Sequence, residues 1–218
     1  MTDKHRRFLG PVVEMRKLHD SAEQRIVHSA EMLDRKSLAS VGDTTGERLT
    51  ALLTETKAHT PEELAANVAR IGELLGRFAL YVPARFTDDP AEQAKYWAVR
   101  SGIFPAVGGS RPAGTTCLSE DVAFHIEDLP RATAELQALI ARHGYDACIY
   151  GHALEDNYHF IINQSFSPPA EVARYEALMN DVAELVSAGT TARSKPSMAR
   201  GATWRPSSAA SGATTPWP

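Results

Sequence analysis

The sequence predicts an α+β fold, a ferredoxin-like plait in which helices cover one face of a mainly antiparallel sheet. Three observations favour this class. Segments with the two-residue period of strands alternate with segments that have the 3.6-residue period of helices. Two strand-like segments flank a short polar turn, as in a hairpin. No glycine-rich phosphate loop follows a strand, which disfavours a doubly wound nucleotide fold.

Periodicity places the elements in order along the chain. Apolar residues at helical spacing predict helices over 26–38, 60–78, 90–99, 129–143 and 168–185. Alternating or short apolar runs predict strands over 48–57, 79–86, 115–126, 147–150 and 159–164. Glycine and proline predict a turn over 42–46 and a loop over 105–114. With 218 residues, 43% of them hydrophobic, the chain can build one domain or slightly more.

Capping residues support the ends of four helices. Thr60 and Glu63 have the spacing of a capping box, with a proline between them at the first helical position. Asp89, also followed by proline, repeats this start signal, and Ser167 is expected to cap the last helix. Gly144 stands where the helix over 129–143 needs a C-terminal glycine.

Composition excludes several function classes. The formal net charge is −4, so general nucleic-acid binding is not expected. No apolar run approaches the roughly 18 residues of a membrane span, and no apolar region follows the basic residues of 1–11 as in a signal peptide. Cys117 and Cys148 form neither a CxxC nor a metal-spaced pair, so we expect a reducing, cytoplasmic location.

The last stretch, 187–218, differs from the rest of the chain. It contains no Leu, Ile, Val, Phe, Asp or Glu, but it has four basic residues and two of the three tryptophans. Such a segment cannot bury enough apolar surface to offset its ordering entropy, so we predict a disordered tail over 188–218. We divide the rest of the chain into an extension of unknown role over 1–27 and one domain over 28–187.

The turn between the last two predicted strands holds the candidate chemistry. His152 and His159 flank it, so a hairpin would bring their imidazoles to the same end of the sheet. Neutral imidazoles bind zinc or a similar divalent ion, which could polarise a substrate carboxylate and hydroxyl. Glu155 and Asp156 add carboxylates, and Asn157 can orient a substrate oxygen. The alternative is a pair of half-buried strand histidines without a metal.

The same turn, GHALEDNYH, resembles the G-H-x-x-x-G-N-x-H signature of the FAD-linked oxidase C-terminal domain. This is the substrate and cap domain of flavin dehydrogenases that act on D-2-hydroxy acids such as D-lactate and D-2-hydroxyglutarate. Further similar segments are 51–56 with 60–64, 89–94 with the W-x-x-R of 97–100, 120–124, and 174–182. The resemblance spans about 28–187 and is closest to enzymes that join a flavin domain to an iron–sulfur domain.

The resemblance implies roles for five residues. His152 and His159 would be catalytic or metal ligands, with Asn157 beside them. Arg100 would bind the substrate carboxylate, because a guanidinium fork matches two carboxylate oxygens. Arg111 is a weaker candidate for the same role. The alternative for Arg100 is an ordinary helix-surface arginine in an ion pair with Glu92 or Asp121.

Three departures accompany the resemblance. Asp156 stands where the family usually has glycine, which predicts either strain in the turn or an altered site. The family's flavin domain, which binds FAD, and its A-E-H-G-T-G motif, which supplies a further ligand and a catalytic histidine, are not found in this sequence. Since the flavin carries the hydride chemistry, we expect this chain to be inactive alone.

A shifted reading frame is a second interpretation of the tail. Synonymous codons can be chosen for residues 189–201 such that regrouping them one base earlier spells YDGSLKAEHGTG. This string contains the motif that the family has after its last helix. We therefore expect a frameshift near residue 188, and a nucleotide sequence without this alternative frame would contradict the idea.

Three functional hypotheses follow. The first is the substrate domain of an FAD-dependent dehydrogenase of D-2-hydroxy acids, completed by a flavin domain. The second is a non-catalytic binding or subunit module that docks on a separate flavoprotein chain, which predicts an exposed apolar patch. The third is a metal-dependent enzyme that uses His152, His159, Glu155 and Asp156.

Overall fold

A computed structural model describes residues 3–21, 25–42 and 50–191. The tail from residue 192 onward, its out-of-frame interpretation and most of the turn predicted over 42–46 lie outside the described residues. The last helix continues to Thr191, so the first residues of the predicted tail, 188–191, are helical.

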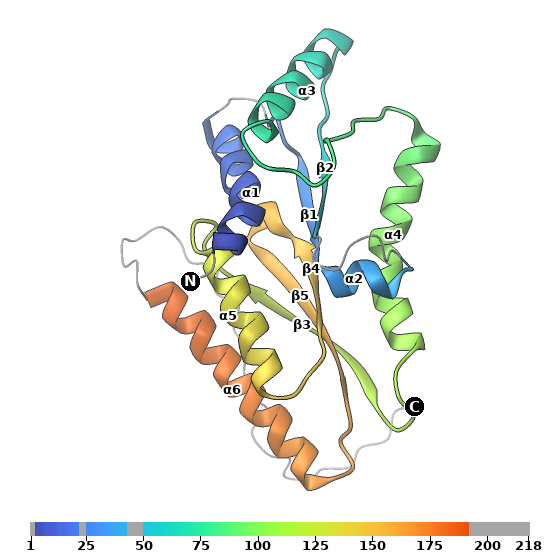
Figure 1. The fold of residues 1–218 in the computed structure, drawn as a ribbon, viewed down its shortest axis with the longest axis vertical. Helices are drawn as coiled ribbons and strands as arrows, with labels where there is room; N and C mark the ends of the chain where they lie inside the picture. Colours follow the sequence, from blue (N-terminus) through green and yellow to red (C-terminus); the bar gives the residue numbers. More distant parts are fainter. Residues whose placement is uncertain (1–2, 22–24, 43–49, 192–218) are drawn as a thin grey trace, which may run out of the picture.

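One antiparallel sheet forms the centre of the molecule (Figure 1). Its strands are β1 (Ser29–Leu33), β2 (Ala51–Glu55), β3 (Thr116–Ala123), β4 (Cys148–His152) and β5 (Asn157–Gln164). The strand order is β2-β1-β4-β5-β3, and every neighbouring pair is antiparallel. The predicted α+β class and the hairpin of β4 and β5 are confirmed.

Helices lie on both sides of this sheet (Figure 1). They are α1 (Asp3–Ser21), α2 (Arg35–Ser40), α3 (Pro61–Leu75), α4 (Pro90–Gly109), α5 (Leu129–Arg142) and α6 (Pro169–Thr191), with a short 3-10 helix, η1 (Ala153–Glu155). The predicted helical layer consists of α1, α5 and α6, which pack with the sheet around the main core. In addition, α2 and α4 cover part of the second face. Among the described helices, none has the length and hydropathy needed to cross a membrane.

Strand alternation divides the side chains of the sheet between the two faces. Along β5, Tyr158 and Phe160 enter the main core under α5 and α6, and both are fully buried. His159 and Ile161 point to the other side, where Ile161 packs with Ile103 of α4. Because successive strand residues alternate, the two histidines of the hairpin lie on the α2–α4 side.

The predicted caps form at three of four positions. The Thr60 hydroxyl accepts from the Glu63 amide at 3.1 Å, and the Glu63 carboxylate accepts in turn from the His59 amide at 3.0 Å. The Asp89 carboxylate accepts from the Ala91 amide at 2.9 Å. Gly144 ends α5 with φ +74°, as a C-terminal glycine should. The last helix begins at Pro169, two residues after the cap expected at position 167.

Three predicted elements were wrong. The segment 26–38 contains β1 and the short α2 rather than one helix, because β1 lies between two strands and is buried on both faces. The polar–apolar alternation of β1 covers only residues 29–32, and Ile26, Ala30 and Leu33 also fit helical spacing. The segment 79–86 has no partner in the described sheet and is not a strand. The loop expected over 105–114 is helical as far as Gly109, because Ile103 anchors α4 in the core despite Pro105.

Candidate active site

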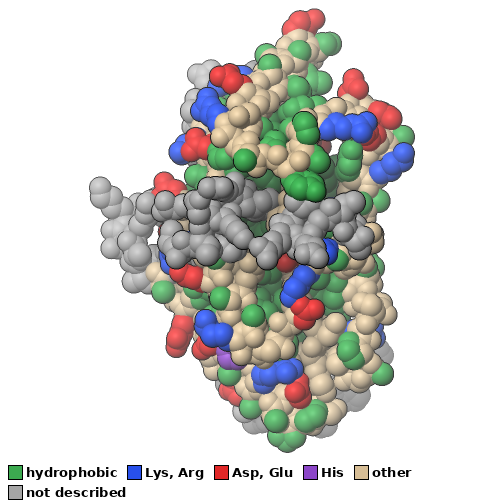
Figure 2. Space-filling model, in the orientation of Figure 1, with side chains coloured by type: hydrophobic (Ala, Val, Ile, Leu, Met, Phe, Trp, Pro, Cys, Tyr) green, Lys and Arg blue, Asp and Glu red, His purple; other side chains and the backbone are tan. Residues whose placement is uncertain are grey.

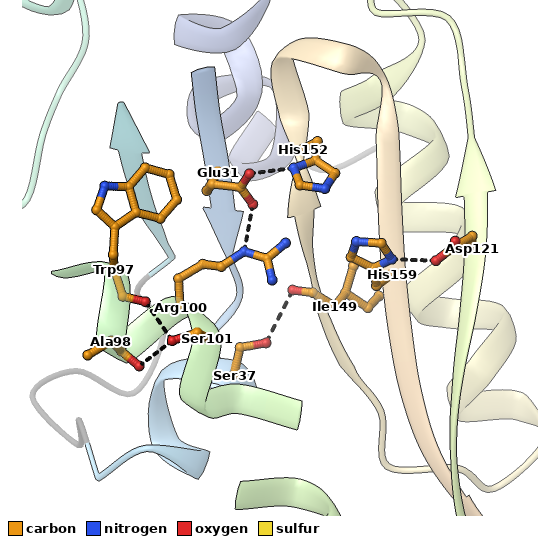
Figure 3. Close-up of polar contacts among 10 residues, drawn as sticks. All are labelled: Glu31, Ser37, Trp97, Ala98, Arg100, Ser101, Asp121, Ile149, His152 and His159. Atoms are coloured by element: carbon orange, nitrogen blue, oxygen red, sulfur yellow. Dashed lines mark hydrogen bonds and ion pairs between the residues drawn. The ribbon is translucent and has the colours of Figure 1, made fainter. Parts of the chain in front are cut away.

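Strand register places each hairpin histidine directly opposite a carboxylate. His152 of β4 faces Glu31 of β1, and His159 of β5 faces Asp121 of β3. In both pairs, the imidazole Nδ1 contacts a carboxylate oxygen of the opposite residue (Figure 3). Directly opposite side chains on one face of a sheet are close enough for such contacts. We call the surface formed by these four residues and Tyr150 the histidine face.

The two imidazoles lie edge to face at the centre of the histidine face. Their ring centroids are 5.4 Å apart, and the rings are inclined at 82°. Tyr150 is opposite His159 in the register, and its ring centroid lies 5.4 Å from that imidazole. The prediction that the hairpin would bring His152 and His159 together is therefore consistent with the geometry.

Arg100 reaches the histidine face from α4 (Figure 3). Its Nε lies 3.0 Å from the second carboxylate oxygen of Glu31, and its guanidinium carbon lies 5.0 Å above the centroid of the Tyr150 ring. The Arg100 side chain is 19% exposed and that of Glu31 is 4% exposed. Glu31 thus contacts two donors at once, Arg100 through one oxygen and His152 through the other. The surface pairings of Arg100 considered from sequence do not form, since Glu92 pairs with Arg85 and Asp121 pairs with His159.

The polar atoms of this face suit recognition of an oxyanion. With Nδ1 of each histidine directed to a carboxylate, Nε2 is the ring nitrogen left for a ligand. The Arg100 guanidinium keeps its two terminal nitrogens beyond the Nε that contacts Glu31. Burial raises the pKa of Tyr150, so its phenol stays neutral at neutral pH. The Tyr150 ring provides an apolar surface beneath the Arg100 guanidinium.

Two unusual backbone positions close the hairpin. Gly151 has φ +147°, and a Cβ there would lie 2.9 Å from the Asn157 carbonyl oxygen and 3.1 Å from the Tyr158 Cα. Glycine is therefore required for β4 and β5 to approach at this point. Asp156 has φ +63°, a left-handed conformation that aspartate adopts more readily than most residues. The position at which the family usually has glycine is therefore one with a positive φ, which glycine adopts freely.

The remaining predicted site residues are placed as follows. Asn157 begins β5 opposite Ala123, two residues before His159 and on the same face of the strand. Glu155 lies in η1. Arg111 donates to the carbonyl oxygens of Gly108 at 2.6 Å and Thr115 at 3.2 Å, so it holds the connection from α4 to β3. That connection enters β3 at the end of the strand away from Asp121.

The structure does not assemble the metal site suggested by the third hypothesis. Among the described residues, no group of three or more His, Cys, Asp or Glu side chains could hold a metal ion. Glu155 and Asp156 follow His152 in the turn, but they do not complete a ligand set with the two histidines. A protein zinc site ordinarily needs at least three protein ligands.

Sequence reasoning missed Glu31 and Tyr150 and named Asp121 only as a surface partner of Arg100. One signal for Glu31 was present, since it is the single Asp, Glu, Lys or Arg over 26–33, a segment in which five of the eight residues are apolar. A charge in a run of that kind is costly to bury unless it has partners. The cross-strand neighbours that supply those partners depend on the register, which the sequence did not reveal.

Solved structures with a similar fold are larger proteins. The structure of p-cresol methylhydroxylase with substrate bound matches with a TM-score of 0.53 and 13% identity over 84% of this chain and 41% of that chain. The 4-ethylphenol oxidase from Gulosibacter chungangensis, in an isoeugenol complex, matches with a TM-score of 0.50 and 13% identity over 87% of this chain and 42% of that chain. This chain thus spans about two fifths of either protein, and at such identity the likeness shows the fold alone.

A comparison with curated protein sequences finds no match. The model of one protein family covers residues 15–190, which include every strand of the described sheet and Arg100, His152 and His159. That family is described as FAD linked oxidases, C-terminal domain, and this chain belongs to it.

Proposed function

We propose that this chain is the substrate-binding domain of an FAD-linked dehydrogenase and that its histidine face, together with Arg100, binds a D-2-hydroxy acid. The observation that carries the proposal is the arrangement of Arg100, whose Nε is held by Glu31 beside two imidazoles (Figure 3). A guanidinium with free terminal nitrogens matches the two oxygens of a carboxylate. The resemblance of the histidine turn supports D-2-hydroxy acids such as D-lactate as the substrate class.

The chain's own residues would act on the substrate in two ways. Arg100 would fix the carboxylate, and this would place the neighbouring hydroxyl at the imidazoles. An imidazole whose Nδ1–H is held by a carboxylate has its basic lone pair on Nε2, which can accept the hydroxyl proton. In both His152 and His159, Nδ1 contacts a carboxylate oxygen, which favours this tautomer. The flavin, when bound by its own domain, supplies the hydride chemistry.

FAD does not fit this domain as its main binding site. Within the described residues, the strand-to-helix connections from β1 to α2, from β2 to α3 and from β3 to α5 contain no glycine. A dinucleotide pyrophosphate usually needs a glycine-rich connection at a helix N-terminus. We therefore assign FAD binding to a second domain or chain and derive no step through it.

An exposed apolar surface is the proposed contact for that flavin-carrying partner. It lies on the connection from α3 to α4, where Figure 2 shows hydrophobic side chains gathered, and it includes exposed apolar residues of α4. Its members are Leu80, Tyr81, Val82, Phe86, Tyr96, Trp97 and Phe104. Tyr81 is 74% exposed and Val82 65%, which is unusual for large apolar side chains. Trp97 precedes Arg100 by one helical turn, so a partner on this surface would border the histidine face.

A divalent ion such as zinc is the alternative use of the same two Nε2 lone pairs, because an imidazole nitrogen that coordinates a metal cannot also accept the hydroxyl proton. His152 and His159 would supply two ligands through Nε2, and each already has on Nδ1 the carboxylate partner that metal-bound histidines commonly have. The substrate's carboxylate and hydroxyl would have to supply others. Calorimetric titration with zinc, with and without D-lactate, tests this: zinc binding that does not depend on His159 contradicts it.

Calorimetry with matched ligands tests the substrate class. The full chain is titrated with D-lactate, with 1,2-propanediol, which lacks the carboxylate, and with p-cresol. Of the three ligands, we expect only D-lactate to bind. Arg100→Lys should lower the affinity for D-lactate by about 10- to 100-fold through loss of charge-assisted hydrogen bonds. Arg111→Lys is the matched control and should bind as the wild type. Binding of p-cresol without D-lactate would favour phenols, as named for the structural neighbours, and would contradict the 2-hydroxy-acid proposal.

A further inference from the structure

We infer that Glu31 is the positioning residue of this site, which sets both the orientation of Arg100 and the tautomer of His152. The inference rests on the proposed function, because those two residues are the proposed substrate contacts. Glu31 would not touch the substrate. It acts through the two side chains that its carboxylate oxygens hold (Figure 3).

The buried surroundings of Glu31 do not by themselves stabilise a charged side chain. It lies in β1 between β2 and β4, opposite Leu53 on one side and His152 on the other, and its side chain is 4% exposed. Its sequence neighbours Ala30 and Met32 are buried in the apolar cores behind the sheet. A buried ion pair contributes little net stability compared with well-packed apolar residues. The retained carboxylate is therefore better explained by the two groups that it orients.

Arg100 is oriented because its Nε is engaged. The 3.0 Å contact to Glu31 fixes the edge of the guanidinium that carries Nε. The plane is further fixed by the Tyr150 ring, 5.0 Å below the guanidinium carbon. Rotation about the terminal bonds is thereby restricted, and the two terminal nitrogens present one edge to a bound carboxylate.

His152 is oriented through its tautomer. An ionised carboxylate accepts hydrogen bonds and cannot donate one, so the imidazole nitrogen that contacts Glu31 must carry the proton. This nitrogen is Nδ1, which leaves the lone pair of a neutral His152 on Nε2. Without Glu31, the proton could move to Nε2, and the base would point away from the substrate.

The two contacts require two acceptor oxygens on one side chain of this length. In Glu31→Gln the amide has one acceptor oxygen and one NH2 donor, so either Arg100 faces a donor or His152 must accept through Nδ1 and carry its proton on Nε2. In Glu31→Asp both oxygens remain, but the side chain is one methylene shorter and cannot reach both groups. Asp121→Asn is the matched control, because it removes a carboxylate from the partner of His159 without touching Arg100 or His152.

Nitrogen NMR of the histidine rings, combined with the D-lactate titration, tests the inference. We expect His152 of the free wild type to be the Nδ1–H tautomer, and Glu31→Gln to shift it toward Nε2–H. We expect D-lactate binding to fall by about 10- to 100-fold in Glu31→Gln. Asp121→Asn should leave the tautomer of His152 unchanged. Glu31→Asp keeps a carboxylate, but it should still bind D-lactate more weakly than the wild type.

The outcomes separate this inference from the proposed function. If the wild type binds no D-lactate but His152 has the expected tautomer, which Glu31→Gln changes, the proposed substrate is wrong and the positioning role stands. If the wild type binds D-lactate but Glu31→Gln changes neither the tautomer nor the affinity, the positioning role is wrong. The wild-type tautomer needs no variant, so an Nε2–H tautomer of His152 overturns the inference even if Glu31→Gln fails to fold.

Discussion

Replacement of Gly151 by alanine is expected to destabilise the hairpin on which both histidines lie. The new Cβ would meet the Asn157 carbonyl oxygen at 2.9 Å, the Tyr158 Cα at 3.1 Å and the His159 amide nitrogen at 3.2 Å. All three are backbone atoms, which cannot move aside as a flexible side chain can. The substitution must therefore separate β4 from β5 or distort both strands.

The magnitude has two parts. Holding alanine at φ +147° costs about 1–3 kcal/mol of backbone strain. Overpacking against fixed neighbours costs about 1–3 kcal/mol more. The sum, about 2–6 kcal/mol, is a large fraction of the roughly 5–15 kcal/mol that stabilises a typical domain.

Urea unfolding followed by circular dichroism measures this loss. Gly114→Ala is the control, because Gly114 also has a positive φ, +79°, but no atom lies within 4 Å of its added Cβ. Gly114→Ala should lose only the free energy that backbone strain costs, about 1–2 kcal/mol. If Gly151→Ala loses no more stability than Gly114→Ala, the close approach of the two strands is not what requires glycine at position 151.

Three further predictions concern the rest of the fold. Burial raises the pKa of Cys148 to about 12, so iodoacetamide at pH 8 should modify Cys117 first, as read by mass spectrometry; faster labelling of Cys148 would contradict its burial. Burial also raises the pKa of Asp34 above its ordinary 3.8, so the stability that this group contributes is greatest below that pH and is lost as pH rises through the raised pKa. The free energy of unfolding of the wild type, relative to that of Asp34→Asn, should therefore decrease as pH rises. An increase with pH would refute the sign. Thr60→Ala removes the cap of α3 and should cost about 1 kcal/mol in the same unfolding assay, whereas an unchanged midpoint would show that the cap is dispensable.

Local signals predicted the elements whose stability is local. The helix starts at Thr60 and Asp89 and the end at Gly144 need only a few neighbouring residues, and these were found. β1 was missed because its polar–apolar alternation covers only four residues and the strands that pair with it are distant in sequence. The exposed segment 79–86 has the composition of a strand but no described neighbour to pair with.

The site shows the same division. The hairpin brings His152 and His159 together through a turn of four residues, which the sequence alone could suggest. Arg100 was identified through resemblance rather than through spacing. Glu31 lies 121 residues from His152 in sequence, and only the antiparallel pairing of β1 with β4 brings them into contact. No local pattern specifies such a pairing.

The most direct test of the proposed oxyanion site is to locate bound D-lactate on the full chain. Two-dimensional NMR of the histidine side chains would be recorded while D-lactate is added to the wild type and to Arg100→Lys. Our account predicts that the ring signals of His152 and His159 shift together in the wild type, and at about 10- to 100-fold higher ligand concentration in the variant. The account would be contradicted if other histidines showed saturable shifts while the signals of His152 and His159 stayed unchanged. Identical titrations of the wild type and Arg100→Lys would also contradict it.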